Sequence, residues 1–212
     1  MERREPLPYL LTAFSRRLYF EKLYKLNSGK IYVKLEAERG DRMNAYITTG
    51  TYDFLLKIKE KYPDEKMVLL QNPEHALLLH ETEGKTVFAS PRRYQLAASS
   101  GNLEDGIFFI FTHLPIPDEG KPVYEFHFKK NTPAIESKPG FAAYRLLRPV
   151  KGDTYIAITG WKDEESFEKW KRSIDYLLVH SLDLTEIGAN KSTYDAPAFT
   201  KEYVIPQDEE EG

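Results

Sequence analysis

The sequence predicts an α+β fold of two lobes, each following the order strand, helix, strand, strand, helix, strand. Three observations predict it. Short apolar runs alternate with segments of helical spacing, this order appears twice, and a proline-rich stretch at 114–121 separates the two copies. With 212 residues, 41% of them hydrophobic, the chain can bury one large core or two small ones. We therefore expect two packed lobes that arose by an internal duplication.

The first lobe is expected over residues 43–113. Strands are predicted at 45–49, 67–70 and 76–80, with the turn signal Asn72-Pro73 between the last two. Apolar residues at helical spacing predict a helix that ends before Pro63, and Pro91 suits the first turn of a second helix through residue 98. A buried strand at 107–112 would complete this lobe.

The second lobe is expected over residues 122–206, after a stiff joint at 114–121. A strand at 123–128 and a short helix beginning at Pro133 would come first, followed by strands at 141–147 and 154–159. Asp163 is predicted to cap a helix, because its side chain can accept from free amides of the first turn. Further helix at 174–182 and a strand at 198–205 would close the lobe, leaving an acidic tail at 207–212.

Residues 1–42 differ from the rest in charge. They hold ten basic and six acidic residues, a net charge of 10 − 6 = +4, although the whole chain carries −3. One interpretation is a basic amphipathic arm that touches an anionic membrane or nucleic acid. The other is a start codon placed too early, because residues 38–41 can be encoded by a purine-rich string that resembles a ribosome-binding site. We prefer the second and expect Met43 to be the natural start.

Composition excludes several kinds of site. Without cysteine the chain has no disulfide, no thiolate metal ligand and no cysteine nucleophile. Its slightly negative charge gives no field to hold nucleic acid, so we expect no nucleic-acid partner. The longest apolar runs fall far short of the roughly 20 residues that span a bilayer. We expect a cytoplasmic protein that is not integral to a membrane.

Two motifs carry a family resemblance, PGFAAYRLLRPVKGDTY at 139–155 and WKDEESFEKW at 161–170. They resemble the IsdG-type haem-degrading monooxygenases of the antibiotic biosynthesis monooxygenase superfamily. From Met43 onward the chain is similar to two-lobed members of that group, of the HmoB and TRAP type. The resemblance implies ferredoxin-like lobes of the dimeric α/β-barrel type, repeated in tandem within one chain. It leaves open whether the protein is a monomer with fused lobes or a dimer.

The resemblance also implies site residues. The family uses an axial histidine, a tryptophan ten positions before it, and an asparagine on the first strand of the lobe. His180 matches the iron ligand and Trp170 the tryptophan that presses on the porphyrin, whereas Phe126 falls where the asparagine is expected. Arg145 and Arg148 are candidates to bind the haem propionates as forked donors. Without the resemblance, Trp170 would be read as core packing, and both arginines as residues on the outer face of a strand.

The function implied is that of an oxygenase for which haem is both substrate and cofactor. It would use dioxygen and an external reductant or reductase, open the porphyrin and release iron. Phe126 cannot donate the hydrogen bond of an asparagine, which favours a second hypothesis, a TRAP-like haem-binding or stress-signalling protein with little oxygenase activity. A third hypothesis is a cofactor-free monooxygenase for a small aromatic substrate, which His180 makes less favoured.

Overall fold

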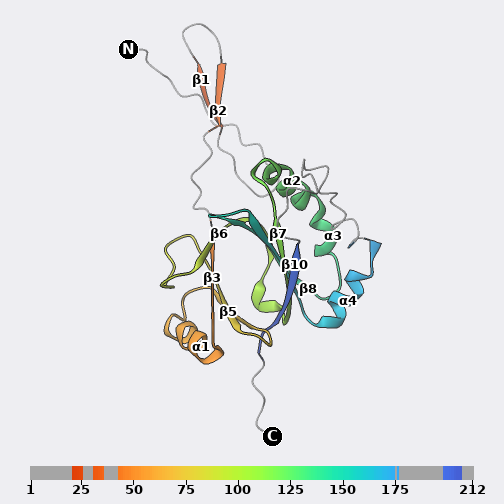
Figure 1. The fold of residues 1–212 in the computed structure, drawn as a ribbon. Helices are drawn as coiled ribbons and strands as arrows, with labels where there is room; N and C mark the ends of the chain where they lie inside the picture. Colours follow the sequence, from red (N-terminus) through yellow and green to blue (C-terminus); the bar gives the residue numbers. More distant parts are fainter. Residues whose placement is uncertain (1–20, 26–30, 36–42, 175, 177–197, 207–212) are drawn as a thin grey trace. The chain divides into compact units, whose positions relative to one another are not determined.

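A computed structural model describes residues 21–25, 31–35, 43–174, 176 and 198–206 of the chain. The chain divides into two compact units, Met1–Arg42 and Met43–Gly212. In the first unit, strands β1 (Glu21–Lys25) and β2 (Ile31–Leu35) pair antiparallel as a hairpin (Figure 1). All other described elements belong to the second unit.

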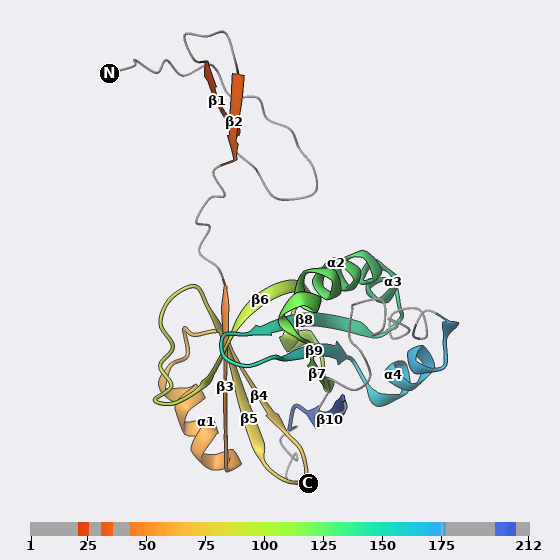
Figure 2. The same ribbon diagram turned by 45° about the horizontal axis from the view of Figure 1, so that its top comes forward.

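The second unit is a closed barrel of strands in the order β10-β4-β5-β3-β6-β8-β9-β7 (Figure 2). Closure comes from β10, which pairs along its length with β7 and at Val204 with Gln71 of β4. The strands are β3 (Asn44–Gly50), β4 (Met67–Gln71), β5 (Ala76–Thr82), β6 (Arg92–Gly101), β7 (Phe108–Pro115), β8 (Phe141–Pro149), β9 (Thr154–Trp161) and β10 (Phe199–Val204).

The barrel consists of two lobes with the same internal strand order. The first has β4-β5-β3-β6 and the second β8-β9-β7-β10, so in each lobe the second, third, first and fourth strands lie side by side. The fourth strand of each lobe pairs with the second strand of the other, β6 with β8 and β10 with β4. The predicted α+β fold with tandem ferredoxin-like lobes is thereby confirmed, and the lobes share one continuous sheet.

Helices cover the barrel from outside on different sides (Figure 2). Helix α1 (Tyr52–Lys61) packs on the strands of the first lobe, while α2 (Lys121–Asn131), α3 (Pro133–Glu136) and α4 (Glu164–Lys171) belong to the second. Two 3₁₀ turns, η1 (Leu103–Asp105) and η2 (Asp118–Gly120), precede β7 and α2. Within the described part of the chain, no helix has the length and apolar character to cross a membrane.

The apolar core forms an inner layer and two outer layers. Alternate residues of the strands point into the barrel, as in β7, where Phe109 and Phe111 face inward. Their neighbours Phe108 and Ile110 face outward, under the helices of the second lobe. A separate outer cluster around Leu55 of α1 covers the first lobe.

Most predicted elements are confirmed. The strands β3, β4, β5, β7, β8, β9 and β10 and the helices α1 and α3 lie where the sequence placed them. The Asn72 turn is also present, because its side chain accepts from the backbone amides of Glu74 and His75, each at 2.9 Å. Asp163 caps α4 as expected, accepting from the Ser166 amide at 2.7 Å. The helix expected at 174–182 lies mostly outside the described residues.

Two predicted elements are wrong. The helix expected from Pro91 to residue 98 is strand β6, which pairs with β3 on one side and β8 on the other. A bulge between Leu96 and Ala98 interrupts the alternation that would have indicated a strand, and pairing on both edges overrides the helix propensity of its leucine and alanines. The strand expected at 123–128 is inside helix α2, which begins beside Pro122 and carries Lys129 and Lys130 in its last turn.

These two errors shift the boundary between the lobes. Because β6 is the fourth strand of the first lobe, β7 is the first strand of the second. We therefore assign the lobes to residues 43–101 and 107–204. The stretch at 114–121 is then no joint between lobes, since it holds the end of β7, η2 and the start of α2.

Candidate functional site

The candidate site lies on the outer side of β7, β8 and β9, under α2, α3 and α4, which we call the helix face. Two apolar clusters occupy it, one around Trp161 and Trp170, the other around Tyr124 and Tyr155. By strand alternation Thr112 of β7 shares this face with the outward residues of β7, and along the strand it lies between the clusters. Between the two clusters, β7 therefore presents a half-buried threonine.

Trp170 is placed on the helix face by helix α4. The helix begins at the Asp163 cap, and the cap hydrogen bond to Ser166 lowers the pKa of the Asp163 carboxyl, which favours its charged, accepting form. Trp170 lies in the last turn and is 3% exposed. Its ring contacts Trp161, with centroids 5.2 Å apart, and Phe167 at 6.1 Å. The core-packing role considered from the sequence is therefore present.

His180, the predicted iron ligand, lies outside the described residues. The nearest described residue before it is Tyr176, whose ring meets Trp170 edge-on with centroids 4.8 Å apart. The backbone amide of Tyr176 also donates a hydrogen bond to Oγ of Ser173, at 3.2 Å. The chain leaving α4 therefore stays packed on Trp170 as far as Tyr176.

Phe126 does not occupy the predicted position on a strand. It lies on α2 and is 64% exposed, whereas its neighbours Tyr124 and Glu125 are buried. The alternation of apolar residues at 123–128 resembled a strand, but in a helix residues two apart point in nearly opposite directions. Phe126 therefore does not line the helix face, and its assignment to the family's asparagine position is wrong.

The first strand of the second lobe is β7, so this strand is where a residue equivalent to the asparagine belongs. Its sequence, FFIFTHLP, contains no asparagine. The residue of β7 that is both polar and on the helix face is Thr112, which pairs across the sheet with Ala157 of β9 and Thr200 of β10. Sequence reasoning missed Thr112 because β7 had been assigned to the first lobe.

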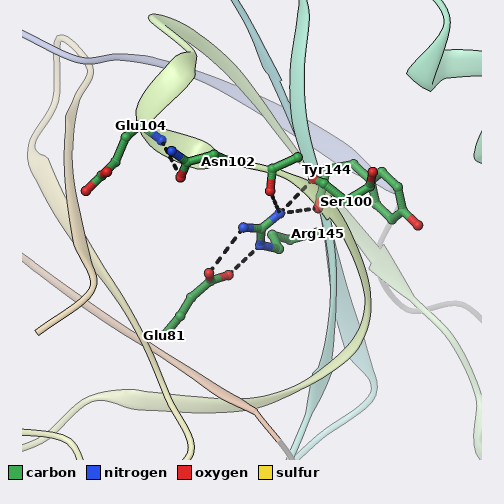
Figure 3. Close-up of polar contacts among 7 residues, drawn as sticks. Glu81, Ser100, Asn102, Glu104, Tyr144 and Arg145 are labelled. Carbon is green, nitrogen blue, oxygen red and sulfur yellow. Dashed lines mark hydrogen bonds and ion pairs between the residues drawn. The ribbon is translucent and has the colours of Figure 1, made fainter. Parts of the chain in front are cut away.

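Arg145 is not on the helix face either. It lies on β8 among residues that point into the barrel, where its Nε donates to Glu81 at 2.5 Å and its Nη2 donates at 3.2 Å (Figure 3). Its Nη1 donates to the carbonyl oxygens of Ser100 at 2.9 Å and Tyr144 at 2.8 Å. Both carboxylate and guanidinium are almost buried, so this ion pair ties β5 of one lobe to β8 of the other. Because its fork is taken up by Glu81 inside the barrel, this geometry does not support the predicted role of Arg145 at a haem propionate.

Arg148, three residues along the same strand, points the opposite way, toward α2. Its Nε donates to Glu125 at 2.5 Å, and its Nη2 donates to the second oxygen of the same carboxylate. Residues three apart on a strand face opposite sides of a sheet, so Arg145 and Arg148 were never compatible with one ligand. Arg148 is a part of the helix face, but its fork is occupied by a carboxylate of the protein.

Glu125 and Tyr155, which the sequence did not single out, complete this polar group. The Tyr155 hydroxyl donates to Glu125 at 2.6 Å from fully inside the protein. Burial alone would raise the pKa of Glu125, but the hydrogen bonds from Arg148 and Tyr155 outweigh it and lower the pKa. Burial raises the pKa of Tyr155, so it stays protonated beside the carboxylate. Recognising Pro122 as a helix start would have placed Glu125 here.

The remaining candidate chemistry lies elsewhere. Among the residues that the structure describes, no group of three or more histidine or acidic side chains is arranged to hold a metal ion. His113 stacks on Phe199 with centroids 4.4 Å apart, and burial, followed by Arg92 and Lys201, lowers its pKa to about 4. His113 is therefore neutral at pH 7 and cannot serve there as a cation for an anionic ligand.

A cavity of about 140 Å³ is lined by Glu81 and Arg145, together with Lys66, Asn102 and Glu104. Figure 3 shows Glu81 paired with the Arg145 guanidinium, while Asn102 accepts from the Glu104 amide nearby. Typical cofactor pockets have about 300–1,000 Å³, so this cavity is too small for a porphyrin. It also belongs to the inner side of the sheet, away from Trp170.

Residues 107–181 match the family described as antibiotic biosynthesis monooxygenase. This segment begins just before β7 and includes α2, α3, β8, β9 and α4. Its start agrees with β7 as the first strand of the second lobe.

The names of similar proteins point to different roles. "Signal transduction protein TRAP" of Staphylococcus aureus (strain MSSA476) is 29% identical over 132 residues, 60% of this chain and 77% of that protein. The solved structure of "a major regulator of staphylococcal pathogenesis" has a TM-score of 0.68 and 26% identity, covering 77% of this chain and 99% of that one. The heme-degrading enzyme LmHde of Listeria monocytogenes has a TM-score of 0.61 and 24% identity over 77% and 99% of the chains, a likeness of fold.

Proposed function

We propose that this chain, whose residues 107–181 form an antibiotic biosynthesis monooxygenase domain, binds haem on the helix face and opens the porphyrin oxidatively. The observation that carries the proposal is Trp170, buried against Trp161 on the helix face ten residues before His180. LmHde, which has the same fold, is a heme-degrading enzyme, and this supports haem as the ligand to test.

The residue types proposed for the site are those that a flat, apolar ligand with one metal ion requires. Trp161 and Trp170 supply two large aromatic rings in contact, and a neutral His180 imidazole would bind iron on one side. Bound haem would supply both the iron centre for dioxygen and the porphyrin that is cut, with electrons from an external reductant or reductase. The protein's own task is then to hold the ring, exclude water from it and orient polar groups beside it.

Haemin titration tests the binding step. We expect the wild-type chain to shift the Soret band, and His180→Ala to abolish the shift while its far-ultraviolet dichroism stays unchanged. The matched control is His127→Ala, because His127 lies on α2 beside the exposed Phe126. An unchanged affinity and spectrum in His180→Ala would reject His180 as the ligand, and loss of the shift in the control would move the site to α2.

Decay of bound haem with ascorbate in air tests turnover. We expect Trp170→Phe to bind haem and to degrade it more slowly, because a smaller ring presses less on the porphyrin. Equal decay rates in the two proteins would reject a role for Trp170 beyond packing. A wild type that binds haem with an unchanged Soret band after ascorbate would reject the oxygenase and leave only binding.

The second candidate is a haem-binding or signalling protein of the TRAP type with little oxygenase activity. It is favoured by β7, which has Thr112 and no asparagine on the helix face. If an amide at this position assists the chemical step, one such hydrogen bond is worth roughly 1.5–3 kcal/mol, or about ten- to a hundredfold in rate. Thr112→Asn should then accelerate haem decay by that factor, whereas Phe126→Asn should leave the rate unchanged. Acceleration by Phe126→Asn instead would restore the strand assignment.

A further inference from the structure

A continuous row of aromatic rings runs along the helix face from Trp170 to Tyr155. Each ring contacts the next, with centroid separations between 5.2 and 6.5 Å. The contacts in order are Trp170–Trp161 (5.2 Å), Trp161–Phe141 (5.9 Å), Phe141–Tyr144 (6.5 Å), Tyr144–Phe128 (5.8 Å), Phe128–Tyr124 (6.1 Å) and Tyr124–Tyr155 (5.5 Å). The row joins both apolar clusters of the helix face and draws on α4, β9, β8 and α2.

The far end of the row differs chemically from the rest. Tyr155 donates its phenolic hydrogen to Glu125 at 2.6 Å, and Arg148 holds the carboxylate in place by a forked contact. Burial keeps Tyr155 protonated, while the hydrogen bonds from Arg148 and Tyr155 keep Glu125 charged. A phenol and a proton acceptor thus lie in contact inside the protein, at one end of a chain of rings.

Tryptophan and tyrosine are the side chains that lose one electron most readily, and an oxidised phenol is a strong acid. An oxidised tyrosine is therefore stabilised where a base can take its proton at once. Phenylalanine is not oxidised under the same conditions, but Phe141 and Phe128 fill the gaps between the oxidisable rings. The transfers between Trp161 and Tyr144 and between Tyr144 and Tyr124 each cross one phenylalanine ring, which replaces empty space by an aromatic contact on either side.

We propose that this row carries an oxidising equivalent from Trp170 to Tyr155. An electron leaves the Tyr155 phenol and fills the hole on oxidised Trp170, while the phenolic proton moves to the Glu125 carboxylate. The products are neutral Trp170, a neutral Tyr155 radical and protonated Glu125. A soluble reductant such as ascorbate restores the pair by returning one electron, and the proton moves back from Glu125. The physiological source of the oxidising equivalent rests on the proposed function, since haem would lie beside Trp170.

The row thus gives the site a second activity, the removal of oxidising equivalents that would otherwise damage the residues around Trp170. Tyr155 suits this role because it is 0% exposed and distant along the row from Trp170. Tyr176 also contacts Trp170, so it competes as an alternative donor. A test must remove that competition.

The absence of cysteine makes a direct test feasible in the full chain without haem. Lys169→Cys, at an exposed position beside Trp170, is labelled with a ruthenium polypyridyl photo-oxidant, and Tyr176→Phe is included in every sample. After a laser flash with an electron acceptor, electron paramagnetic resonance should detect a neutral tyrosyl radical. Tyr155→Phe should reduce this signal to background, whereas Tyr203→Phe, inside the barrel and outside the row, should leave it unchanged.

Two further variants separate the path from its end point. Phe128→Leu should lower the radical yield, because it removes one bridging ring. If the phenolic proton moves to the Glu125 carboxylate, radical formation should be slower in D₂O than in H₂O. Glu125→Gln should abolish this difference. A tyrosyl signal that persists in Tyr155→Phe, or a D₂O effect that persists in Glu125→Gln, would overturn the proposal. Because no haem is present, this outcome is independent of whether the proposed haem function holds.

Discussion

The orientation of α2 decides which residues can act on the helix face, and a pair of alanine substitutions tests it. Tyr124 is 4% exposed and contacts the rings of Phe128 and Tyr155, whereas Phe126 is 64% exposed. Truncating a buried aromatic residue costs about 3–5 kcal/mol, which is the loss expected for Tyr124→Ala. The partial burial of the Phe126 side chain contributes roughly 0.5–1 kcal/mol to stability. In Phe126→Ala the higher helix propensity of alanine offsets about half of this loss. Phe126→Ala should therefore change stability by no more than about 0.5 kcal/mol.

Urea denaturation followed by far-ultraviolet dichroism measures both values. Tyr124→Ala should lower the midpoint strongly with an unchanged slope, and Phe126→Ala should leave the midpoint nearly where it is in the wild type. On a strand, residues 124 and 126 would share one face and lose similar stability. Equal losses in the two variants would refute the helix and return Phe126 to the candidate site.

Three other measurements follow from the barrel. Arg145→Met should lower the free energy of unfolding by about 3–5 kcal/mol, because it leaves the Glu81 carboxylate buried and unpaired. The double variant with Glu81→Leu should regain part of this stability, and a double variant no more stable than Arg145→Met would contradict the view that the two side chains stabilise the barrel as a pair. The His113 pKa of about 4 in the fold, against an ordinary 6.5, means that the unfolded chain binds more protons between those values. Stability should then fall with pH from 6.5 to 4, by at most about 1.4 kcal/mol per pH unit, and His113→Gln should flatten that slope. Gly101 and Gly152 both have positive φ, +67 and +87, but a Cβ added at Gly101 would lie 2.0 Å from a carbonyl oxygen, whereas one at Gly152 would lie in open space. Gly152→Ala should therefore cost roughly 1–2 kcal/mol of stability, and Gly101→Ala well over that. Equal melting temperatures of the two variants would contradict this geometry.

The elements that the sequence predicted correctly are those with a strong local cause. Asp163 caps its helix through a hydrogen bond within one turn, and Asn72 closes its turn in the same way. The apolar runs of β4 and β5 are buried on both faces, so their pattern depends little on what pairs beside them. Local chemistry was sufficient there.

The elements that failed depend on distant parts of the chain. Strand β6 is defined by pairing with β3 and β8, and its bulge hides the period that a single sequence displays. Helix α2 buries Tyr124 and Glu125 against β8 and β9, contacts that no local alternation reveals. At the site, the resemblance supplied Trp170, but the polar group around Glu125 could not be found while residues 123–128 were assigned to a strand.

The two errors compensate each other, so the predicted order of elements remains regular despite both. The first lobe has one helix among its described elements, and the prediction of β6 as a helix gave it a second one. The same prediction made β7 the last strand of the first lobe. Taking α2 for a strand then supplied the first strand that the second lobe had lost. The predicted order stayed regular while every assignment between 91 and 128 moved by one element. The reassignment changes the candidate polar residue of the helix face from Phe126 to Thr112, from a side chain that cannot donate a hydrogen bond to one that can. Slow but measurable haem decay in the wild type, abolished by Thr112→Val with binding retained, is what this reassignment predicts. Decay that is unaffected by Thr112→Val would leave Thr112 as a structural residue of β7.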